Sequence, residues 1–471
     1  MQNKNIKLAF ATAAVLVTLA FFLIVLDSQL SAILKFVLAA GTLAVCGIAI
    51  ATALGMDGWG GLYMLRSKHG LDTIDSIARR WPGFWELLAE MGMVVAYGSF
   101  AYFLMAKKKR TLANIVCVWA LGTFFLVLLS ALLPVAMNVL LSMVSGGAEF
   151  AGAGAQMQGT LAKLDFVKYV SLALMMLGGI ALTVTASIVA FAAMVASAFL
   201  QAAMGNSAVL ANTQPGGMPI LPGINLDLVT GVIALAIVLV VHEGMHGILA
   251  RIYKLPLTSA GLVFFGFLPF GAFVDINEKK LFKEKREKQN AVFVAGTTAN
   301  FTASIVVYLM LLLFVSSTEG FRVSGVYVDS GTLPHGTVIN SINGVPIYTL
   351  LNANLSPNTT YSIETSSGVF ERTTDAKGRI GIMYVVADRS GSFGALRYAP
   401  EFSWMQFVLE VLGLTFALNI VVASVNLVPL PLFDGYYLMK NAVGNNRWVV
   451  TAITYLVSAA FLLTLLPWIL K

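Results

Sequence analysis

Charge is scarce in this sequence. Only 11% of its 471 residues are Asp, Glu, Lys or Arg, 58% are hydrophobic, and the mean hydropathy is +0.83. Soluble globular domains carry about 25% charged residues. The composition therefore excludes an ordinary water-soluble protein and predicts an integral membrane protein.

Cysteine and histidine are also rare. The chain has two cysteines, Cys46 and Cys117, and both fall inside apolar runs, so neither a disulfide framework nor a cysteine metal site is expected. Its four histidines make any close pair informative. The net charge of +7 comes from short basic runs beside apolar segments, such as 107–110. Such runs are topology signals, so we expect a lipid bilayer around the chain and no nucleic-acid partner.

Long apolar runs, in contrast, recur from end to end. Each run is long enough to cross a hydrocarbon core of about 30 Å as a helix. We predict a polytopic α-helical protein of the cell membrane, and we expect the first run to be a retained helix because no cleavage-site pattern follows it. The nine predicted spans lie near 6–26, 30–54, 89–106, 111–143, 167–203, 227–250, 291–316, 405–428 and 448–470.

The chain is predicted to have four parts. They are an N-terminal helical block (1–205), the first part of a core (206–318), a polar insertion (319–400) and the second part of the core (401–471). A mixed polar segment at 55–88 interrupts the first block and carries no motif with recognisable chemistry. Its aromatic residues are expected to anchor the chain at a membrane interface; they are Trp59, Tyr63, Trp81 and Trp85.

The segment 258–280 is apolar but is not expected to be a helix. Gly266, Pro269 and Gly271 interrupt it, and aromatic and β-branched residues flank a Leu-Pro turn. We predict a membrane-associated β-hairpin. Its edges must be covered by protein or must line a wet cavity, because open strand edges do not face lipid.

The stretch 319–400 is the one clearly polar insertion. Short alternating runs separated by Gly, Asn, Pro and Asp predict a small β-rich domain. Within it, "LPHGTVINSINGVPI" (333–347) resembles the part of PDZ domains in which a strand and an Asn-Gly turn precede a short helix. A truncated or merely PDZ-like domain fits the short length.

Basic runs predict the orientation of the second half. The run at 277–288, with Lys440 and Arg447, is expected to be cytoplasmic. The insertion is then extracytoplasmic, and the span at 227–250 runs inward. Continued alternation puts 107–110 outside, against the same rule. Either one span is miscounted, with 167–203 the candidate, or the rule is broken here.

The end of the span at 227–250 carries "HEGMH". His242 and His246 are four residues apart, so a helix brings both side chains to one face, where two imidazoles can bind one Zn²⁺. Glu243, one residue along, can accept a proton from an attacking water without being a ligand. The alternative is a pair of core histidines with a neutral Glu243. It is weakened because an ionisable group in a spanning helix costs about 2.5–3.5 kcal/mol and usually marks function.

A third ligand is predicted at Asp434, within "NLVPLPLFDGYYL" (426–438). Pro429 and Pro431 prevent a regular helix, and Gly435 permits a tight turn, so the carboxylate lies on broken backbone at membrane depth. Such backbone is tolerated inside protein or at a wet cavity. The alternative for Asp434 is an ordinary turn residue at a helix end.

Together, H-E-x-x-H and the downstream N-x-x-P-x-x-x-x-D-G resemble the site-2 protease family of intramembrane zinc metalloproteases. The resemblance covers about 227–470, and it includes the hairpin, the sequence "AGTTANF" at 295–301 and the PDZ-like insertion. Gly296-Thr297 departs from the Gly-Pro that is common in the family. The first 200 residues lie outside the shared core.

The resemblance implies hydrolysis of a peptide bond within or near a membrane span. His242, His246 and Asp434 would hold one zinc ion per chain, Glu243 would be the general base, and Asn426, with Pro429 of the same motif, would bind the substrate backbone. The expected substrate is a single-pass membrane protein that has already been trimmed, cut nearer the cytoplasmic face. Two other classes are a zinc- or proton-coupled transporter, which predicts internal repeats that we do not see, and a catalytically silent scaffold.

Overall fold

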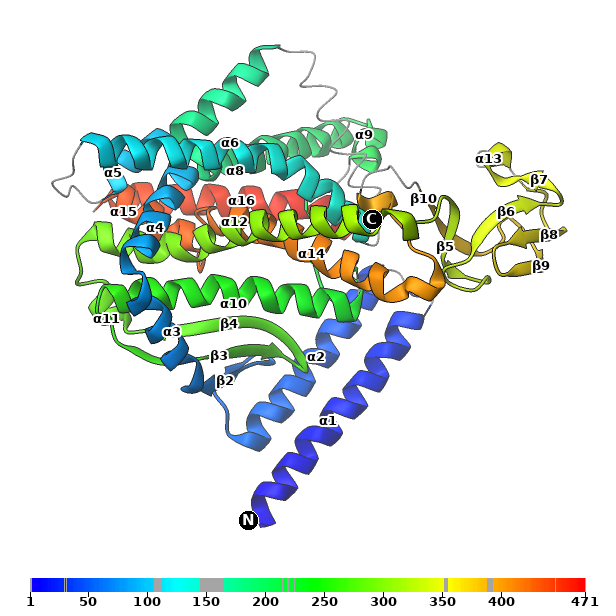
Figure 1. Ribbon diagram of the computed structural model, residues 1–471, viewed down its shortest axis with the longest axis horizontal. Helices are drawn as coiled ribbons and strands as arrows, with labels where there is room; N and C mark the ends of the chain where they lie inside the picture. The colour runs from blue at the N-terminus through cyan, green and yellow to red at the C-terminus, as the bar shows by residue number, and fades with distance from the viewer. Residues whose placement is uncertain are drawn as a thin grey trace.

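The structure is a computed structural model of the chain (Figure 1). It describes residues 2–470 except 29, 31, 106–111, 145–164, 214, 218–219, 224, 351–354, 388–392 and 445. In this part of the chain, nine helical segments are long and apolar enough to cross a membrane. These segments confirm the predicted class, a polytopic helical membrane protein.

The membrane-length segments agree closely with the predicted spans. They are α1 (Gln2–Asp27), α2 (Ala32–Leu54), α4 (Pro82–Tyr97) continued by α5 (Ala101–Leu104), α6 (Leu112–Met143), α8 (Asp165–Ala203), α10 (Leu228–Ile252), α12 (Arg286–Ser317), α14 (Ser403–Asn426) and α16 (Arg447–Leu470). The shorter helices are α3 (His69–Arg80), α9 (Ser207–Asn212), α11 (Glu278–Leu281), α13 (Ile347–Leu350) and α15 (Asp434–Val443).

The helices α10, α12 and α14 form the centre of the bundle and pack against one another (Figure 1). Buried Leu249, Val294 and Ala423 belong to one apolar cluster that joins the three helices. Around this centre, α4 packs on α12, and α6 packs on both α4 and α14. Two helices of the N-terminal block, α4 and α6, therefore pack directly on the core.

An antiparallel sheet packs against α10 in the order β1-β2-β3-β4. The predicted hairpin is present as β3 (Leu257–Phe265) and β4 (Leu268–Ile276). The sequence did not predict β1 (Gly58–Trp59) or β2 (Leu62–Ser67), which add to the β3 edge from the segment 55–88. The expectation that Tyr63 anchors an interface is wrong. Its side chain is buried and stacks on Phe264, with ring centroids 5.5 Å apart.

The span predicted at 167–203 is bent. Gly179 has φ 62° and ψ −157°, a conformation that divides α8 into two helical segments. The bend lies beside the end of α4, where Ser99 Oγ donates to the Met176 carbonyl at 2.9 Å. The bend supports an interruption within 167–203, one of the two alternatives that the basic runs left open.

Two contacts fix the direction of α6. The Asn290 side chain donates to the Leu104 carbonyl at 3.0 Å, so α5 ends beside the start of α12. At its other end, Ser142 of α6 lies against Gly394, next to the polar insertion. The basic run 107–110 is outside the described residues. Leu104 lies at the end of the bundle that carries the run 277–288, and Ser142 lies at the opposite end.

The insertion forms a second antiparallel sheet at one end of the bundle (Figure 1). Its main strand order is β10-β5-β6-β8-β9, with β7 beside β6. Asn343 and Gly344 have φ of 49° and 75° and form the predicted turn that precedes α13. The PDZ likeness beyond this piece stays a prediction. The strands are β5 (Gly325–Gly331), β6 (Val338–Ile342), β7 (Val345–Pro346), β8 (Thr360–Thr365), β9 (Gly368–Thr373) and β10 (Ile382–Ala387).

Candidate metal centre

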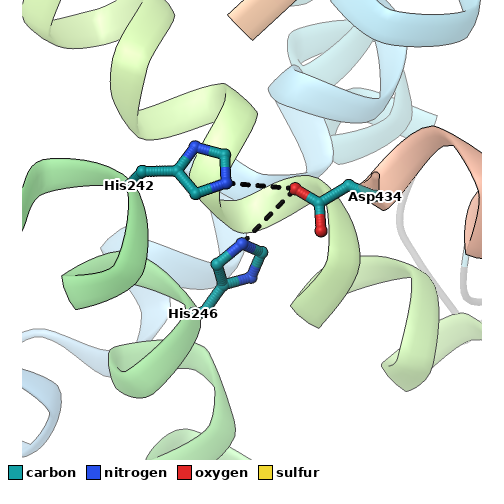
Figure 2. A group of neighbouring side chains, drawn as sticks. All are labelled: His242, His246 and Asp434. Atoms are coloured by element: carbon teal, nitrogen blue, oxygen red, sulfur yellow. Dashed lines mark ion pairs between the residues drawn. The ribbon is translucent and has the colours of Figure 1, made fainter. Parts of the chain in front are cut away.

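One helix supplies three of the predicted site residues. The Asp227 carboxylate caps α10, accepting from the backbone N–H of Val229 at 3.0 Å and of Thr230 at 2.9 Å. Four turns later, His242 and His246 point to the same side and are buried, with exposed fractions of 6% and 8%. Figure 2 shows both imidazoles turned toward Asp434.

Asp434 reaches the site from the loop between α14 and α15. The predicted break in the helix is present, because α14 ends at Asn426 and α15 begins at Asp434. The expected turn at Gly435 is wrong: the left-handed residue of this loop is Leu432, with φ 76°. Gly435 lies in the first turn of α15, where the Leu427 carbonyl occupies the space that a side chain would need.

The three side chains form a group of the right size for a metal ion. Their potential ligand atoms lie within 4.8 Å of one another. Asp434 Oδ2 is 3.3 Å from His242 Nε2 and 3.4 Å from His246 Nε2. Ligands about 2.1 Å from a tetrahedral ion lie about 3.4 Å from each other, so these separations fit zinc.

The hydrogen bond of His246 decides which of its ring nitrogens faces Asp434. The Nδ1–H of His246 donates to the Val292 carbonyl at 2.7 Å, so Nε2 is the nitrogen that faces Asp434 Oδ2 and could bind a metal ion. Asp434 Oδ2 is buried and accepts no hydrogen bond. A buried carboxylate oxygen 3.4 Å from an imidazole nitrogen is stabilised by a positive charge, which either a metal ion bound between the two atoms or a proton on Nε2 can supply.

His242 is oriented by an amide that the motif did not include. Asn300 of α12 is fully buried, and its Nδ2 lies 3.1 Å from His242 Nδ1 while its Oδ1 has no partner. With its amide N and O exchanged, Asn300 would accept from His242 Nδ1–H through Oδ1, which would leave Nε2 free for a metal. In the sequence, the only sign of this residue is an amide in the apolar run 295–301.

Gly296 keeps the ion's place open. A Cβ at this position would be 2.5 Å from the Nε2 atoms of both His242 and His246. Any side chain would therefore occupy the space in front of the ligand atoms. This close approach gives the first residue of the unusual Gly296-Thr297 pair a clear role.

Glu243 lies beside this group without belonging to it. Its Oε2 accepts from the backbone N–H of Val274 in β4 at 3.2 Å, so the side chain lies between α10 and the strand edge. The predicted substrate-binding residues lie on the chain that leads to Asp434. Asn426 is half-buried at the end of α14, and Pro429 is buried in the following loop. The roles of all three residues stay predictions.

Comparison with known proteins agrees with this geometry. The model of peptidase family M50 matches residues 230–466, half of the chain, including both motifs. An uncharacterized protein of Methanocaldococcus jannaschii is 25% identical over 224 residues, which cover 44% of this chain and 56% of that protein. The chain thus spans just over half of that relative's length. The matched region and its content place the chain in peptidase family M50, the site-2 protease family of metallopeptidases.

Proposed function

We propose that this protein is an intramembrane zinc metalloendopeptidase that cuts a single-pass membrane protein within or near its membrane span. The observation that carries the proposal is the buried cradle of His242, His246 and Asp434, with Glu243 beside it, in a bundle of membrane-length helices. A transporter or a silent scaffold needs no carboxylate base next to a three-ligand group.

The donor set fits Zn²⁺, which binds neutral imidazole and carboxylate in four-coordinate sites and keeps a position open in enzymes. The ion, when bound, lowers the pKa of water to about 7 and polarises a carbonyl. The protein's own part is to hold each ligand in one state. The Val292 carbonyl accepts from His246 Nδ1–H, Asn300 with its amide exchanged would accept from His242 Nδ1–H, and Gly296 keeps the space in front of both Nε2 atoms open.

Glu243 is proposed as the general base. It accepts a proton from the attacking water as the water oxygen bonds to the peptide carbon, and it then donates a proton to the amide nitrogen as the C–N bond breaks. The Val274 N–H holds Oε2 at 3.2 Å, so the side chain is presented in one direction before substrate arrives.

The sheet offers a place for an unwound substrate. A helical substrate hides its peptide groups in hydrogen bonds from residue i to residue i−4, so the segment must be extended before attack. Among the described residues β3 pairs on both sides, while β4 pairs only with β3. A substrate strand is therefore proposed to add to β4 through main-chain bonds, next to Glu243. Asn426 is proposed to bind the same backbone near the scissile bond.

The positions of the second sheet and of the basic runs suggest how the protein is oriented in the membrane. The β5–β10 domain lies at the end of the bundle away from the run 277–288. If the positive-inside bias holds, the domain is extracytoplasmic and the cut lies nearer the cytoplasmic face. The domain is then placed to exclude substrates whose outer parts have not been trimmed, as in regulated intramembrane proteolysis.

The test uses purified protein in lipid vesicles. The substrates are tagged single-pass test proteins whose apolar helices carry a Gly-Pro pair at successive depths; we call them the test set. We expect about one zinc per chain and one cut in at least one member. Glu243→Gln should keep the metal and lower cleavage by about 10²–10⁴-fold, because a base is removed and no ligand is disturbed. Equal cleavage by the variant, or no cleavage by either protein, would overturn the proposal.

A further inference from the structure

The N-terminal segment 55–88 lies outside the matched family region, yet one of its side chains reaches the sheet beside the metal centre. Arg66 is in β2, opposite Gly261 of β3. Its side chain is 40% exposed, so it lies over the sheet rather than inside the bundle. A cation next to membrane-length helices is costly unless it is well paired.

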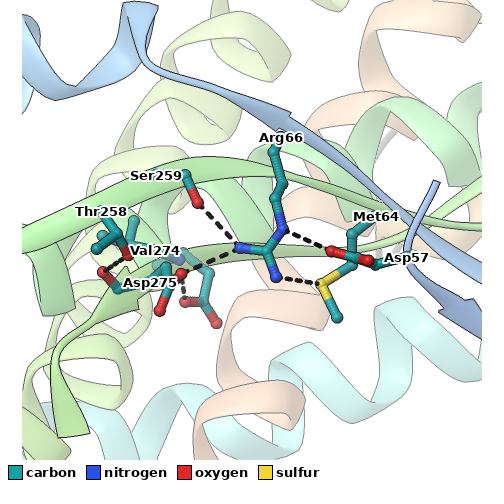
Figure 3. Close-up of polar contacts among 8 residues, drawn as sticks. Asp57, Met64, Arg66, Thr258, Ser259, Val274 and Asp275 are labelled. Atoms are coloured by element: carbon teal, nitrogen blue, oxygen red, sulfur yellow. Dashed lines mark hydrogen bonds and ion pairs between the residues drawn. The ribbon is translucent and has the colours of Figure 1, made fainter. Parts of the chain in front are cut away.

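Arg66 is paired to three parts of the sheet (Figure 3). Its Nη1 donates to Ser259 Oγ of β3 at 3.1 Å and to Asp275 Oδ2 of β4 at 3.0 Å. Its Nε is 3.4 Å from Asp57 Oδ2, just before β1. The guanidinium also lies 5.3 Å from the Phe273 ring centroid. The planar guanidinium group has several N–H donors in fixed directions, so it can pair with several partners at once better than a lysine ammonium group can.

Asp275 is the residue next to Val274, whose N–H holds Glu243. The same part of β4 is tied to β3 by Thr258 Oγ1, which donates to the Asp275 carbonyl at 3.2 Å. The hydrogen bond from Val274 to Glu243 is already 3.2 Å long, so a small shift of β4 away from α10 would break it. The chain of contacts therefore runs from Arg66 through Asp275 and Val274 to Glu243.

A second ion pair joins the same N-terminal segment to the other partner of this contact. Arg251, in the last turn of α10, lies 2.6 Å from Asp75 of α3. The segment thus holds both β4 and α10, the two elements between which Glu243 lies. This independent contact favours a role in setting their separation.

We propose that Arg66 is a positioning residue for the catalytic base. By holding Asp275, it keeps β4 where the Val274 N–H can orient Glu243, so a part of the chain outside the family core sets the geometry of the active site. The inference rests on the proposed function.

The first variants are Arg66→Gln, Arg66→Lys and Asp275→Asn, assayed with the test set in vesicles. Misplacing a reacting group by about 1 Å costs up to about 10²-fold in rate. We expect Arg66→Gln and Asp275→Asn each to lower kcat at least 10-fold with full zinc content, and their combination to be no worse than either alone. Arg66→Lys should recover part of the rate because it keeps the charge that Asp275 needs. Arg79→Gln, an exposed arginine of α3, is the matched control and should match the parent.

A binding measurement separates positioning from substrate capture. In the Glu243→Gln background, which does not cut, adding Arg66→Gln should weaken binding of the test set much less than Arg66→Gln alone lowers kcat, because β4 keeps its pairing with β3. Amide exchange at 272–276 should be faster in Arg66→Gln, while exchange in α10 should not change.

An unchanged kcat in Arg66→Gln overturns the inference, as does a loss explained by lower zinc content or weaker capture. If Glu243→Gln abolishes cleavage and Arg66→Gln does not affect it, the inference alone fails. If the parent does not cut the test set, both proposals fail.

Discussion

The family-matched core and the N-terminal block use polar residues in opposite ways. In the core, polar groups are inside: His242, His246 and Asn300 are all buried and contact one another or backbone carbonyls. In the block, α1 turns large apolar side chains outward; Val17 and Ile24 are 70% and 67% exposed. The block's notable ionic contacts lie where it meets the core, at Arg66 and Asp75. The polar residues of the core thus line the candidate metal centre, whereas those of the block lie where the block contacts the core.

The largest loss of bound zinc and of cleavage should come from filling the space in front of the two histidine Nε2 atoms. Gly296→Ala places a methyl group 2.5 Å from both Nε2 atoms, so we expect loss of bound zinc and of all cleavage. Metal content measured by mass spectrometry is the readout. Gly244→Ala is the control, since a Cβ there meets nothing within 4 Å, and it should keep its zinc. Full metal content in Gly296→Ala would show that the ion binds elsewhere.

Removing the carboxylate should be nearly as severe. Asp434→Ala takes away the one anionic ligand from the group of three, so zinc should no longer survive purification, and the two buried imidazoles should be left without their partner. Treatment of the parent with a strong chelator should give the same loss of cleavage, restored by added zinc. Asp434→Ala that keeps a full complement of zinc would contradict its role as a ligand.

Loss of a residue that orients a ligand should have a smaller effect. Asn300→Ala leaves all three ligands but removes the partner of His242 Nδ1, so we expect zinc affinity to fall by about 10–100-fold. Titration with a competing chelator measures the change. Asn419→Ala, which removes a buried amide that bonds the Thr415 carbonyl within α14, is the control and should keep the parent's affinity.

Breaking an ion pair that joins the N-terminal block to the core should have a still smaller effect. Asp75→Asn breaks the 2.6 Å ion pair with Arg251, in which both side chains are about one-third exposed. Pairs of this kind contribute about 0.2–1 kcal/mol, so the thermal midpoint should fall by a few degrees at most. Zinc content should be unchanged. A loss of zinc in Asp75→Asn would show that this ion pair supports the metal centre itself and not only the packing of α3 on α10.

The smallest effect concerns the β5–β10 domain, at one end of the bundle. The backbone N–H of Arg379, helped by the Lys377 N–H and the Arg379 guanidinium, holds the pKa of Asp375 below its usual value. A lowered pKa gives stability that is present above the unfolded pKa and is lost as pH falls through the folded pKa. The protection of the amides at 375–379, relative to their intrinsic exchange rates, should therefore fall in acid, and Asp375→Asn should remove most of that dependence. An identical acid response in the variant would contradict this assignment.

Much of the fold can be predicted from the sequence because few backbone structures can cross a lipid bilayer. Long apolar runs can only be helices, so the nine spans were predicted within a few residues, apart from the start of the third. His242, Glu243, His246 and Asp434 were singled out because ionisable groups are rare in such runs. The structure brings the three predicted ligands together, and their identity as ligands awaits the variants above.

The missed features depend on contacts between distant segments. The strands β1 and β2 have two and six residues with no clear alternation, and β2 pairs with a strand about 200 positions later. The bend at Gly179 gives no local signal, since glycine is common in straight membrane helices. Asn300 and Gly296 acquire their roles only because α12 packs against α10.

The order of the first sheet bears on how copies of the protein behave toward one another. A sheet with two long open edges can join the sheets of neighbouring molecules and extend without limit. Here β2 covers one side of the hairpin, and beyond it only the two residues of β1 are paired. Very short outer strands are a known protection against edge-to-edge aggregation. Among the described residues, the arrangement leaves β4 as the one nine-residue strand with an unpaired edge, so edge-to-edge pairing between copies is limited to the side on which we propose that a substrate strand adds.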